Sequence, residues 1–473
     1  MNTFSLALRN VLRNRRRTLI TLGAIGVAAA AIVVLGGYVS ATLKGLQTLT
    51  VRDTGHLHVM TEGWLEFGRA DPGQYALRDA DTLERLLEED DTLRPMLRVV
   101  TPMLQLQGVA GYFESGNSST FVATGWLPEP RQHMLTWDGL GTGLPPVASH
   151  LDPARPEAGM MGVGLAQLLG MCDALKLTDC AERPADSVDA DAPAIGDDLA
   201  ELGQQTRTLA NGERQKPSAG EVALELMAAS SGGAPNVVRM PISEARRLGE
   251  RELDNMYVGM PLPLAQRLVF GPDRHEVSAL VLQLHHTDQL PATRARVETL
   301  LHEHHRTHGG PRLEVRSFMD VQPTYNQIVT MFNTLLGFVA VLMLVVTLFS
   351  VANTVNMAVS ERSNEIGTLR AIGLTRGDIL RLFITEGGLL GLLGGSLGVL
   401  SAIALSVWGI NRAGLSWTPP GNTTPVDIRV DIAGNLPLCA AIVGMMMLIA
   451  CLSAWWPARR ASRQEIVEAL RHV

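Results

Sequence analysis

The sequence is poor in lysine and cysteine, and each shortage excludes a class of protein. Among 473 residues there are only three lysines, Lys44, Lys176 and Lys216. None of them stands in the motif Gly-x-x-x-x-Gly-Lys-Ser/Thr, so we expect no nucleotide-binding P-loop on these residues. Four cysteines are too few for a disulfide framework. The chain is therefore neither a P-loop ATPase nor a small disulfide-stabilised protein.

Long hydrophobic runs, in contrast, are plentiful. The run from Leu19 to Tyr38 is uncharged and about 20 residues long, enough for a helix to cross a hydrocarbon core of roughly 30 Å. Three more runs follow, at Met331–Val355, roughly Ile379–Trp408, and Leu436–Trp456. We expect four transmembrane helices.

A cleaved signal peptide is the alternative for the first run. An arginine-rich start precedes it, and Val39-Ser40-Ala41 is an acceptable cleavage site. However, the run is longer than the usual core of about 7 to 15 residues, and further hydrophobic runs follow. We favour a retained span.

Arginine is concentrated before the first run, between the second and third runs, and after the fourth. The positive-inside rule places these three regions in the cytoplasm, and residues 44–327 and 411–435 outside it. Before the first run, apolar residues recur at helical spacing against arginines, which predicts an amphipathic helix on the inner leaflet. An ordinary basic tail is the alternative. The apolar residues are Phe4, Leu8, Val11 and Leu12.

The large region outside the membrane alternates strand and helix patterns. Two strand–helix–strand blocks flank an insertion, which predicts one α+β layer with an inserted lobe. Residues 181–235 of the insertion are rich in Ala, Asp, Gly, Ser and Pro, so we expect them to be loop-rich. The expected strands are 56–60, 99–109, 119–124, 277–284 and 313–317, and the expected helices are 80–89 and 292–304.

Two of the cysteines, Cys172 and Cys180, lie close together in this region, whereas Cys439 and Cys451 fall in the last hydrophobic run. Disulfides persist outside the cytoplasm. Either Cys172 and Cys180 form one bridge, or both thiols are free and point apart.

Histidines gather at residues 302–308 without forming a known zinc motif. A zinc peptidase needs His-Glu-x-x-His, and Arg306 occupies the fifth position of that motif when His302 is the first. His304 and His308 share a helical face at i, i+4, which permits a metal or a proton-sensing pair. We favour a solvated helix end, and we expect no metal site and no catalytic residue.

The loop between the second and third runs predicts a short amphipathic helix. A cap-like Ser360 opens it, and Ile366, Leu369 and Ile372 form an apolar edge. Gly373 suits a left-handed helix end. Thr375–Asp378 then begins a new helix that leads into the third run, so a push on the short helix would reach the membrane.

The third run combines regularly spaced glycines with one acid. Such glycines let another helix approach closely. Glu386 stands near the membrane surface, where it should face protein or water. It is either a conformational pivot that senses the short helix or an interfacial acid paired with Arg381 or Arg376. The glycines are Gly387, Gly391 and Gly395, with Gly394 and Gly398 as a second pair.

The short segment resembles the signature of a known family. Its residues 361–373, Glu-Arg-x-x-Glu-Ile-Gly-x-x-Arg-Ala-Ile-Gly, are similar to those of FtsX-like and MacB-like ABC permeases, the type VII group that includes the lipoprotein-releasing permeases. The tail, with Pro457-Ala458-Arg459-Arg460-Ala461 and Val467-Glu468-Ala469-Leu470-Arg471, resembles the family's C-terminus, although Gln464-Glu465 interrupts the usual pattern. The chain departs from MacB-like permeases in the narrow sense, which carry a fused ATPase.

The resemblance implies a non-catalytic permease subunit of an ABC transporter in the bacterial inner membrane, with both termini cytoplasmic and the large domain periplasmic. Two copies of a separate cytoplasmic ATPase would bind ATP and Mg²⁺, and this chain would carry no cofactor. The other expected partners are the lipid bilayer and a second permease, identical or similar. A periplasmic adaptor or acceptor is a further candidate, and we expect no nucleic acid.

The implied mechanism is mechanotransmission, in which ATP hydrolysis drives export or extraction of a lipoprotein, a lipid or a periplasmic molecule. Two alternatives differ in class. One is an FtsX-like signalling permease that activates a cell-wall hydrolase without transport, and the other is a membrane-anchored enzyme that uses the histidine cluster. The size of the region 44–327 favours transport.

Under this interpretation the fold class is an α+β membrane protein with four transmembrane helices, a porter-like extracytoplasmic domain with an inserted lobe, and an amphipathic N-terminal helix. The residues that couple to the ATPase are Glu361, Arg362, Glu365, Ile366, Arg370 and Gly373. The packing and pivot residues of the third span are Glu386, Gly387, Gly391 and Gly395.

The expected segments follow in chain order. They are the N-terminal helix 1–18, span one 19–43, the extracytoplasmic domain 44–327 (porter-like halves 53–152 and 272–322, inserted lobe 153–271), span two 328–357, the coupling segment 358–378, span three 379–410, a short outer loop 411–435, span four 436–456, and the tail 457–473.

Overall fold

The structure is a computed structural model that describes residues 3–13, 15–178, 180, 222–419 and 421–463. The tail motif expected at 467–471 and most of the loop-rich stretch 181–235 lie outside these residues. The chain forms two compact units. The helical unit comprises Met1–Leu46, Thr324–Trp417 and Val426–Val473, and the sheet unit comprises Gln47–Pro323 and Thr418–Pro425.

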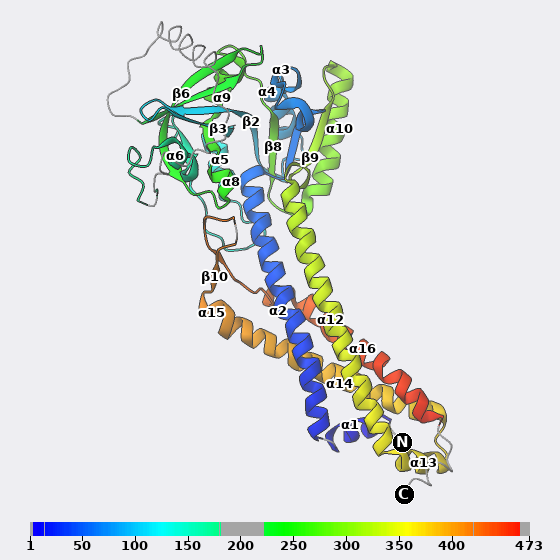
Figure 1. Cartoon of the computed structure of the whole chain (residues 1–473). Helices are drawn as coiled ribbons and strands as arrows, with labels where there is room; N and C mark the ends of the chain where they lie inside the picture. Colours follow the sequence, from blue (N-terminus) through cyan, green and yellow to red (C-terminus); the bar gives the residue numbers. More distant parts are fainter. Residues whose placement is uncertain (1–2, 14, 179, 181–221, 420, 464–473) are drawn as a thin grey trace. The chain divides into compact units, whose positions relative to one another are not determined.

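The described part of the chain has four helices that are long and apolar enough to cross a membrane (Figure 1). Each contains one of the predicted hydrophobic runs, and together with the mixed sheet unit they confirm the coarse class of an α+β membrane protein. The four are α2 (Arg15–Thr54), α12 (Pro323–Glu361), α14 (Arg376–Ala404, continued by a π-helix at Leu405–Ile410 and by α15, Asn411–Ala413) and α16 (Leu436–Ser462).

Two of these helices are much longer than a bilayer requires. At 1.5 Å per residue, the 40 residues of α2 span about 60 Å, roughly twice a hydrocarbon core. The helix ends at Gly55, whose φ of +73° favours glycine and whose N–H donates to the carbonyl of Val51 at 2.9 Å. Helix α12 begins with Pro323, which needs no N–H donor at a helix start.

Glycines let α14 contact two other helices at backbone distance. A Cβ added at Gly391 would lie 2.7 Å from the backbone oxygen of Met446 in α16. A Cβ at Gly398 would lie 2.4 Å from the backbone oxygen of Gly26 in α2. The two series of glycines therefore pack against two different helices. Gly387 and Gly395 lie against α16, and Gly394 lies against α2.

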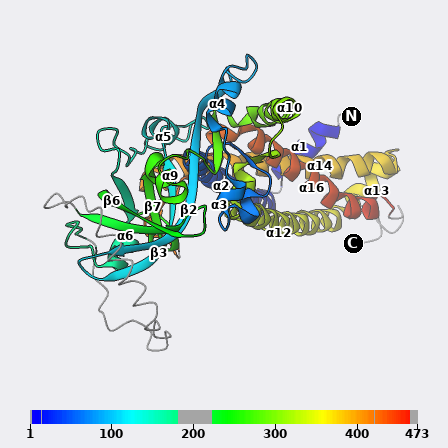
Figure 2. The same ribbon diagram turned by 90° about the horizontal axis from the view of Figure 1, so that it is seen from above.

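The sheet unit is built on a nine-stranded mixed sheet, counted over the described residues, in which β2 and β3 run side by side (Figure 2). The strand order is β3-β7-β4-β6-β5-β2-β8-β1-β9. The strands are β1 (Leu57–Thr61), β2 (Leu97–Tyr112), β3 (Asn117–Trp126), β4 (Gly159–Gly162), β5 (Ala223–Ala229), β6 (Pro235–Arg246), β7 (Tyr257–Pro261), β8 (Ala279–Leu284) and β9 (Leu313–Ser317).

The segment 153–271 that we expected as an inserted lobe contributes β4 to β7 to this same sheet. The reason is the length of β2, whose 16 residues extend beyond β8. Its first residues pair with β8, and Val109–Gly111 pair with Glu225–Met227 of β5. In the described residues the insertion is thus continuous with the two flanking blocks.

The strands and helices predicted in the flanking blocks are present as β1, β2, β3, β8 and β9 and as α4 (Ala80–Glu88) and α10 (Leu290–His308). Helix α9 (Leu262–Phe270) packs on the other part of the sheet and buries Leu264, Ala265 and Leu268. The remaining helices are short: a π-helix at Trp64–Gly68, α3 (Pro72–Tyr75), α5 (Pro128–Leu135), α6 (Val163–Leu169), α8 (Arg251–Asp254), a 3-10 turn at Thr287–Gln289, and α11 (Phe318–Val321).

A disulfide joins Cys172 and Cys180, whose Cα atoms lie 5.5 Å apart. The bridge follows α6 in the sheet unit. Of the two alternatives that the sequence left open for this pair, the structure contains the bridged one. Cys439 and Cys451, in α16, are free thiols.

His56 is a neutral core residue of the sheet unit. Its side chain is fully buried between the rings of Trp137 and Phe318, at centroid distances of 5.1 and 6.3 Å. Its Nδ1 accepts a hydrogen bond from the N–H of Leu284 at 3.0 Å, so the ring proton is on Nε2, beside the Thr287 hydroxyl. Burial lowers the pKa of His56 from 6.5 to about 3.

We predict that the free energy of unfolding decreases as the pH falls below about 6.5. An unfolded His56 binds a proton near that pH, whereas the folded form rejects it until about pH 3, so the stability is present above this window and lost within it. His56→Leu should reduce the number of protons taken up on unfolding by about one, and so reduce the slope of the free energy of unfolding against pH. His302→Gln, at an exposed position, should leave that slope unchanged. Chemical unfolding between pH 5 and 7 measures the slope, and identical slopes in all three proteins would contradict the assignment.

Alanine at Gly391 should lower the melting temperature of the protein. The added carbon would lie 2.7 Å from both the Met446 oxygen and the Met447 Cα, and overpacking of this kind costs about 1–3 kcal/mol. Gly444→Ala in α16 is the matched control, because a Cβ there meets nothing within 4 Å and both substitutions gain the same helix propensity. Thermal unfolding in one detergent makes the comparison, and equal melting temperatures would show that α14 and α16 are not in backbone contact.

Candidate functional site

Helix α13 (Ser363–Ala371) is the short helix expected between the second and third hydrophobic runs. Its start differs from the prediction, because α12 continues through Glu361 and Arg362 is the N-cap, so Ser360 lies inside α12. Its end agrees with the prediction. Gly373 has a φ of +111°, and its N–H donates to the carbonyl of Arg370 at 3.1 Å.

Helix α14 begins almost at once with a reciprocal cap. The hydroxyl of Thr375 accepts a hydrogen bond from the N–H of Asp378 at 3.3 Å, and the Asp378 carboxylate accepts one from the N–H of Thr375 at 3.0 Å. Only a few residues separate the two helices. The connection between α13 and α14 is therefore short and hydrogen-bonded.

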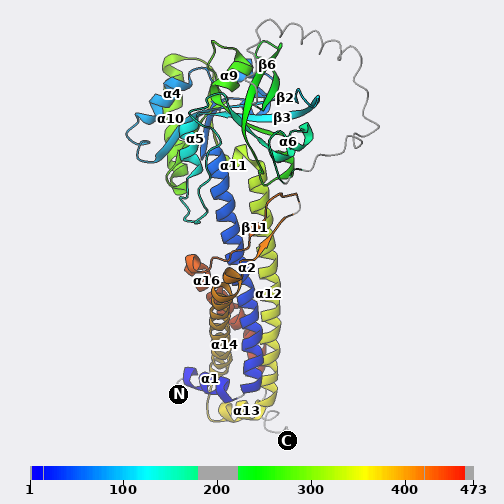
Figure 3. The ribbon, with the colours of Figure 1, turned by 90° about the vertical axis from the view of Figure 1, so that its left-hand side faces the viewer.

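Acidic residues of α12 and α13 pair with arginines near the N-terminus. Arg13, at the end of α1 (Thr3–Arg13), has its Nη2 atom 2.6 Å from Glu365 Oε1. Arg17, in the first turn of α2, pairs with Glu361. Figure 3 shows α1 and α13 at the same end of the helical unit. The N-terminal segment and α13 are thus joined by opposite charges.

Glu365 accepts hydrogen bonds from two arginines, because Arg362 Nε also lies 2.9 Å from its Oε2 atom. Partial burial by itself raises the pKa of Glu365, but the bonds from Arg13 and Arg362 outweigh it and hold the pKa below its usual value. The pairs therefore persist above the ordinary carboxyl pKa and are lost only as the pH falls through the lowered value. Because Glu365 is about half exposed, each pair contributes roughly 1 kcal/mol or less.

Arg362 also connects α13 to α14 through Glu386. Its Nη1 atom lies 3.8 Å from Glu386 Oε2, and its other terminal nitrogen donates to the side chain of Asn10 in α1. The Glu386 side chain is only 12% exposed, and its Oε2 atom has no hydrogen-bond partner. The acid is therefore enclosed by protein, with Arg362 as its ion-pair partner and Asn10 as a hydrogen-bond partner, which is how carboxylates in apolar helices are tolerated.

One of the two alternatives for Glu386 was a pair with Arg381 or Arg376, but the structure pairs it with Arg362. Arg381 precedes it by five residues, which places it about 140° away around the same helix, and Arg376 lies about 15 Å away along the axis. The partner instead comes from α13. The pair is therefore a link between two helices and not a local contact within one.

The residues predicted to contact an ATPase divide into two groups. One group takes part in ion pairs or packing within the helical unit, namely Glu361, Arg362, Glu365 and Ile366. Ile366 is only 4% exposed. In the other group, Arg370 is half-buried and Gly373 is exposed beside Ile372, which is 76% exposed. The apolar surface that α13 offers to a partner is therefore at its C-terminal end.

The loop between α14 and α16 enters the sheet unit. Strands β10 (Ser416–Trp417) and β11 (Val426–Asp427) pair in the helical unit, and the residues between them, Thr418–Pro425, belong to the sheet unit. There the N–H of Thr423 donates to the carbonyl of Gly249 at 2.6 Å, and the N–H of Arg251 donates to the carbonyl of Gly421 at 2.9 Å. This loop is a third connection between the units, besides α2 and α12.

The histidine cluster of α10 shows no arrangement for a metal. In the part of the chain that the structure describes, no group of three or more His, Cys, Asp or Glu side chains is placed to hold an ion. The rings of His304 and His308 stack at 4.5 Å, and the hydrogen-bond partners of His308 Nδ1 are Thr307 and the His304 carbonyl of the same helix.

Comparison with known proteins identifies the C-terminal part of the helical unit. Residues 337–466, which include α13 and α14, match the family described as FtsX-like permease C-terminal. The chain carries an FtsX-like permease domain. The resemblance to FtsX-like and MacB-like ABC permeases, inferred from the sequence of the short segment, is confirmed.

The relatives include two proteins named macrolide export ATP-binding/permease protein MacB. The one from Sodalis glossinidius (strain morsitans) is 34% identical over 155 residues, which is 33% of this chain and 21% of the relative. The one from Bdellovibrio bacteriovorus is 27% identical over 234 residues, 49% of this chain and 33% of the relative. The lipoprotein-releasing system transmembrane protein LolC of Neisseria meningitidis serogroup B is 26% identical over 249 residues, 51% and 57% of the two chains. The chain thus matches between about a fifth and just over half of these relatives' lengths.

We did not predict from the sequence that residues near the N-terminus contact α13 and the end of α12. Asn10, Arg13 and Arg17 contact α13 or the end of α12, although we had interpreted the arginines only as the basic side of an amphipathic helix or as a basic tail. A pattern that could have indicated them is present. The arginine-rich start has no acid of its own, and Glu361 and Glu365 stand in the segment that the positive-inside rule places on the same side of the membrane.

We predict that Arg362 and Glu386 stabilise the permease domain cooperatively. Arg362→Met should destabilise the wild-type protein more than it destabilises a Glu386→Gln background, because only the wild type then retains a buried, unpaired carboxylate. The coupling energy should be about 0.5–3 kcal/mol, towards the lower end because the charged atoms lie 3.8 Å apart.

A double-mutant cycle of thermal unfolding in detergent measures this coupling. Arg376→Met combined with Glu386→Gln is the control cycle and should show additive effects. Additive effects for Arg362 as well would show that the pair does not exist in the membrane-embedded protein.

Proposed function

We propose that the chain is the permease subunit of an ABC transporter in the bacterial inner membrane. Four apolar helices, the FtsX-like permease match and the names of the relatives support this function. The arginine-rich segments support cytoplasmic termini and a periplasmic sheet unit, because basic residues are retained on the cytoplasmic side. The chain is non-catalytic in this proposal, and ATP and Mg²⁺ are bound by a separate ATPase present in two copies.

The observation that carries the proposal is the attachment of α13 to α1 and α14. Glu365 holds it to Arg13 of α1, and its N-cap Arg362 holds it to Glu386 of α14. Beside it, Glu361 at the end of α12 pairs with Arg17 of α2. The ATPase binds the C-terminal end of α13, where Ile372 exposes an apolar side chain between small neighbours. Closure of the ATPase pair then moves α13, α1 and the start of α14 together.

The outer ends of the helices transmit this movement. Helix α2 continues into the sheet unit as a single helix, α12 begins at Pro323, the last residue of that unit before the helical unit resumes, and the loop Thr418–Pro425 belongs to the sheet unit. A shift of α14 against α2 therefore changes the positions at which three chain segments join the sheet unit. We propose that this rearrangement acts on the cargo, which need not cross the bilayer.

The names of the relatives support a proposal for the class of cargo. One relative is named for macrolide export and another for lipoprotein release. We propose a lipoprotein, a lipid or a periplasmic molecule, exported or extracted by two permease subunits that are identical or similar. A periplasmic adaptor or acceptor would receive it.

Reversing the charge of Glu365 should uncouple ATP hydrolysis from transport. Glu365→Lys replaces two attractive contacts, with Arg13 and Arg362, by repulsion, and exposed pairs of this strength change an equilibrium by up to about fivefold. ATP-dependent release of lipoprotein or dye from proteoliposomes, divided by the ATPase rate, measures the coupling. Adding Arg13→Glu should restore part of the loss, since it recreates one opposite-charge pair.

Arg9→Glu is the matched control for that rescue. Arg9 is exposed on the same helix as Arg13, and the described residues give it no ion-pair partner. Arg9→Glu should therefore not restore coupling to Glu365→Lys. Unchanged coupling in Glu365→Lys would show that α13 is only a turn, and failure of any ATPase to co-purify in mild detergent would contradict the proposed function itself.

A further inference from the structure

A small cavity of about 200 Å³ with a mixed polar and apolar lining lies in the sheet unit, at the residues where α2 ends and α12 is about to begin. Asp53 and Thr54, the last residues of α2, contribute to its lining, as does Gln322, which precedes α12. Its volume is below the roughly 300 Å³ at which pockets for drug-sized ligands begin. The cavity therefore suits a small molecule.

Strand register explains why polar side chains gather there. His58 pairs with Val281, and Val281 pairs with Thr101 of β2, so His58 shares a sheet face with Thr101 and, two and four residues on, with Met103 and Gln105. The same register continues the face into β3 and β7. Gln105 lies opposite Thr124, and Gln107 lies opposite Val122, which pairs with Tyr257. One sheet face thus supplies His58, Gln105, Gln107, Thr124 and Tyr257 to the cavity.

His58 forms part of the cavity floor and has an unsatisfied atom. Its Nε2 atom lies 2.7 Å from the carbonyl oxygen of Thr54. A carbonyl only accepts, so Nε2 carries the proton and Nδ1 presents a lone pair. The residue is 1% exposed, and Nδ1 is buried without any hydrogen-bond partner. Because an unsatisfied buried acceptor is costly, a ligand hydroxyl at the floor would be stabilised.

Burial lowers the pKa of His58 from 6.5 to about 4, against the smaller raising effect of its bond to Thr54. The ring is therefore neutral at neutral pH and keeps the acceptor free. It recognises a donor and not an anion.

The side walls add donors and acceptors that the protein leaves free. Within the described residues, the side-chain amides of Gln105, Gln107 and Gln322 make no hydrogen bond to protein. An amide offers two donors and an acceptor in fixed geometry, which suits hydroxyl groups. Three such amides in one small cavity match a ligand with several hydroxyls better than an apolar one.

The cavity has one unpaired charge. Asp53 is neutralised by Arg131, which is 3% exposed, lies over the ring of Trp126 at 4.7 Å and also donates to the Asp53 carbonyl at 2.6 Å. Arg69 lines the cavity and has no ion-pair partner in the part of the chain that is described. Its guanidinium is available for a carboxylate or phosphate group.

We propose that this cavity binds a small hydroxylated anion, a polyol that carries one carboxylate or phosphate group. Arg69 binds the anionic group, the three glutamine amides bind hydroxyls, and the lone pair of His58 Nδ1 accepts the innermost hydroxyl proton. This site is independent of the ATPase contact on α13, and its occupancy does not depend on the transport function proposed above.

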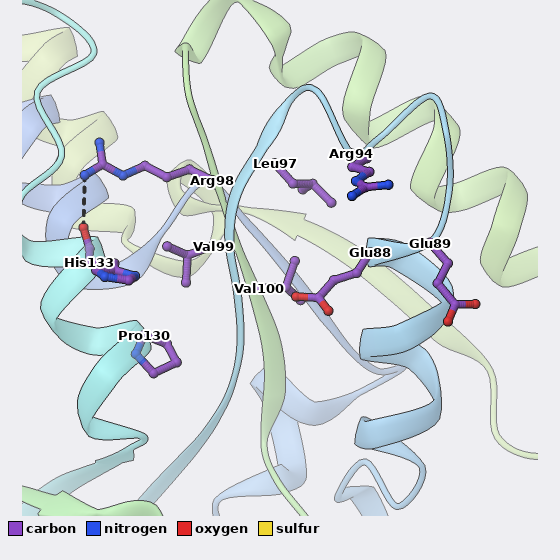
Figure 4. A pocket seen from close by; sticks show the side chains of 9 residues that line it. All are labelled: Glu88, Glu89, Arg94, Leu97, Arg98, Val99, Val100, Pro130 and His133. Carbon is purple, nitrogen blue, oxygen red and sulfur yellow. Dashed lines mark hydrogen bonds between the residues drawn. The ribbon is translucent and has the colours of Figure 1, made fainter. Parts of the chain in front are cut away.

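A second, larger cleft in the sheet unit is a weaker candidate. Its volume is about 630 Å³, and Figure 4 shows Leu97, Val99 and Val100 along its floor, between the acids of α4 and His133 of α5. Its Arg98 already donates to Thr136 and to the His133 carbonyl. Among the described residues, none that lines it has a buried polar atom without a partner. It nevertheless supplies a control, because it is also lined by an exposed arginine, Arg94.

Isothermal titration of the full-length protein in nanodiscs, without any ATPase, tests the site. The probes are D-glycerate, sn-glycerol 3-phosphate and uncharged glycerol. We expect saturable binding of at least one anion at one site per chain and much weaker binding of glycerol. Arg69→Gln should weaken binding of the anion by about tenfold or more, as expected for a lost hydrogen bond between charged groups, and should leave the affinity for glycerol unchanged. Gln105→Met should weaken the binding of all three probes.

Arg94→Gln is the matched control and should leave every affinity unchanged, and all variants should melt at the wild-type temperature. The proposal is overturned if neither anion binds saturably. It is also overturned if Arg94→Gln weakens binding as much as Arg69→Gln does. A failed transport assay with intact anion binding would count against the proposed function and not against this site.

Discussion

Backbone contact between helices is the constraint on which the permease domain depends. Lipid is as apolar as leucine, so spans associate through close packing rather than through the hydrophobic effect. Helix α14 meets α16 at Gly391 and α2 at Gly398, with no side chain between the backbones. Glu386 stands one residue before Gly387, which also packs against α16. Any side chain that separated the helices would therefore also displace Glu386 from Arg362, which ties the buried charge to the packing.

The charged contacts around α13 serve two different purposes because they differ in exposure. Arg13 and Glu365 are both well exposed, so water and salt screen their attraction and it contributes little to stability. Such a pair orients a helix, and breaking it costs little free energy. Glu386 is enclosed, and loss of its cation would leave a desolvated charge. In the proposed mechanism, the first contact permits movement, and the second keeps α13 and α14 together during it.

Much of this architecture follows from local patterns in the sequence. Four helices follow from hydropathy, and the ends of α13 and α14 follow from Gly373 and the Thr375 cap, because these features depend on neighbouring residues. Contacts between distant segments do not. The sequence could not show that Arg362 and not Arg381 pairs with Glu386, nor that one glycine series faces α2 and the other α16. The single sheet also escaped prediction, because it depends on how far β2 extends past β8.

The position of the small cavity links binding of its proposed ligand to the positions of two long helices. Its lining includes the last residues of α2 and the residue before α12, so a bound molecule contacts both ends at which these long helices join the sheet unit. If transport shifts one helix end relative to the other, the two states of the cavity bind the ligand with different affinity. Linkage then requires that the ligand bias the helices by the same free energy. A site of this kind would let its ligand influence how easily the two helix ends move relative to one another.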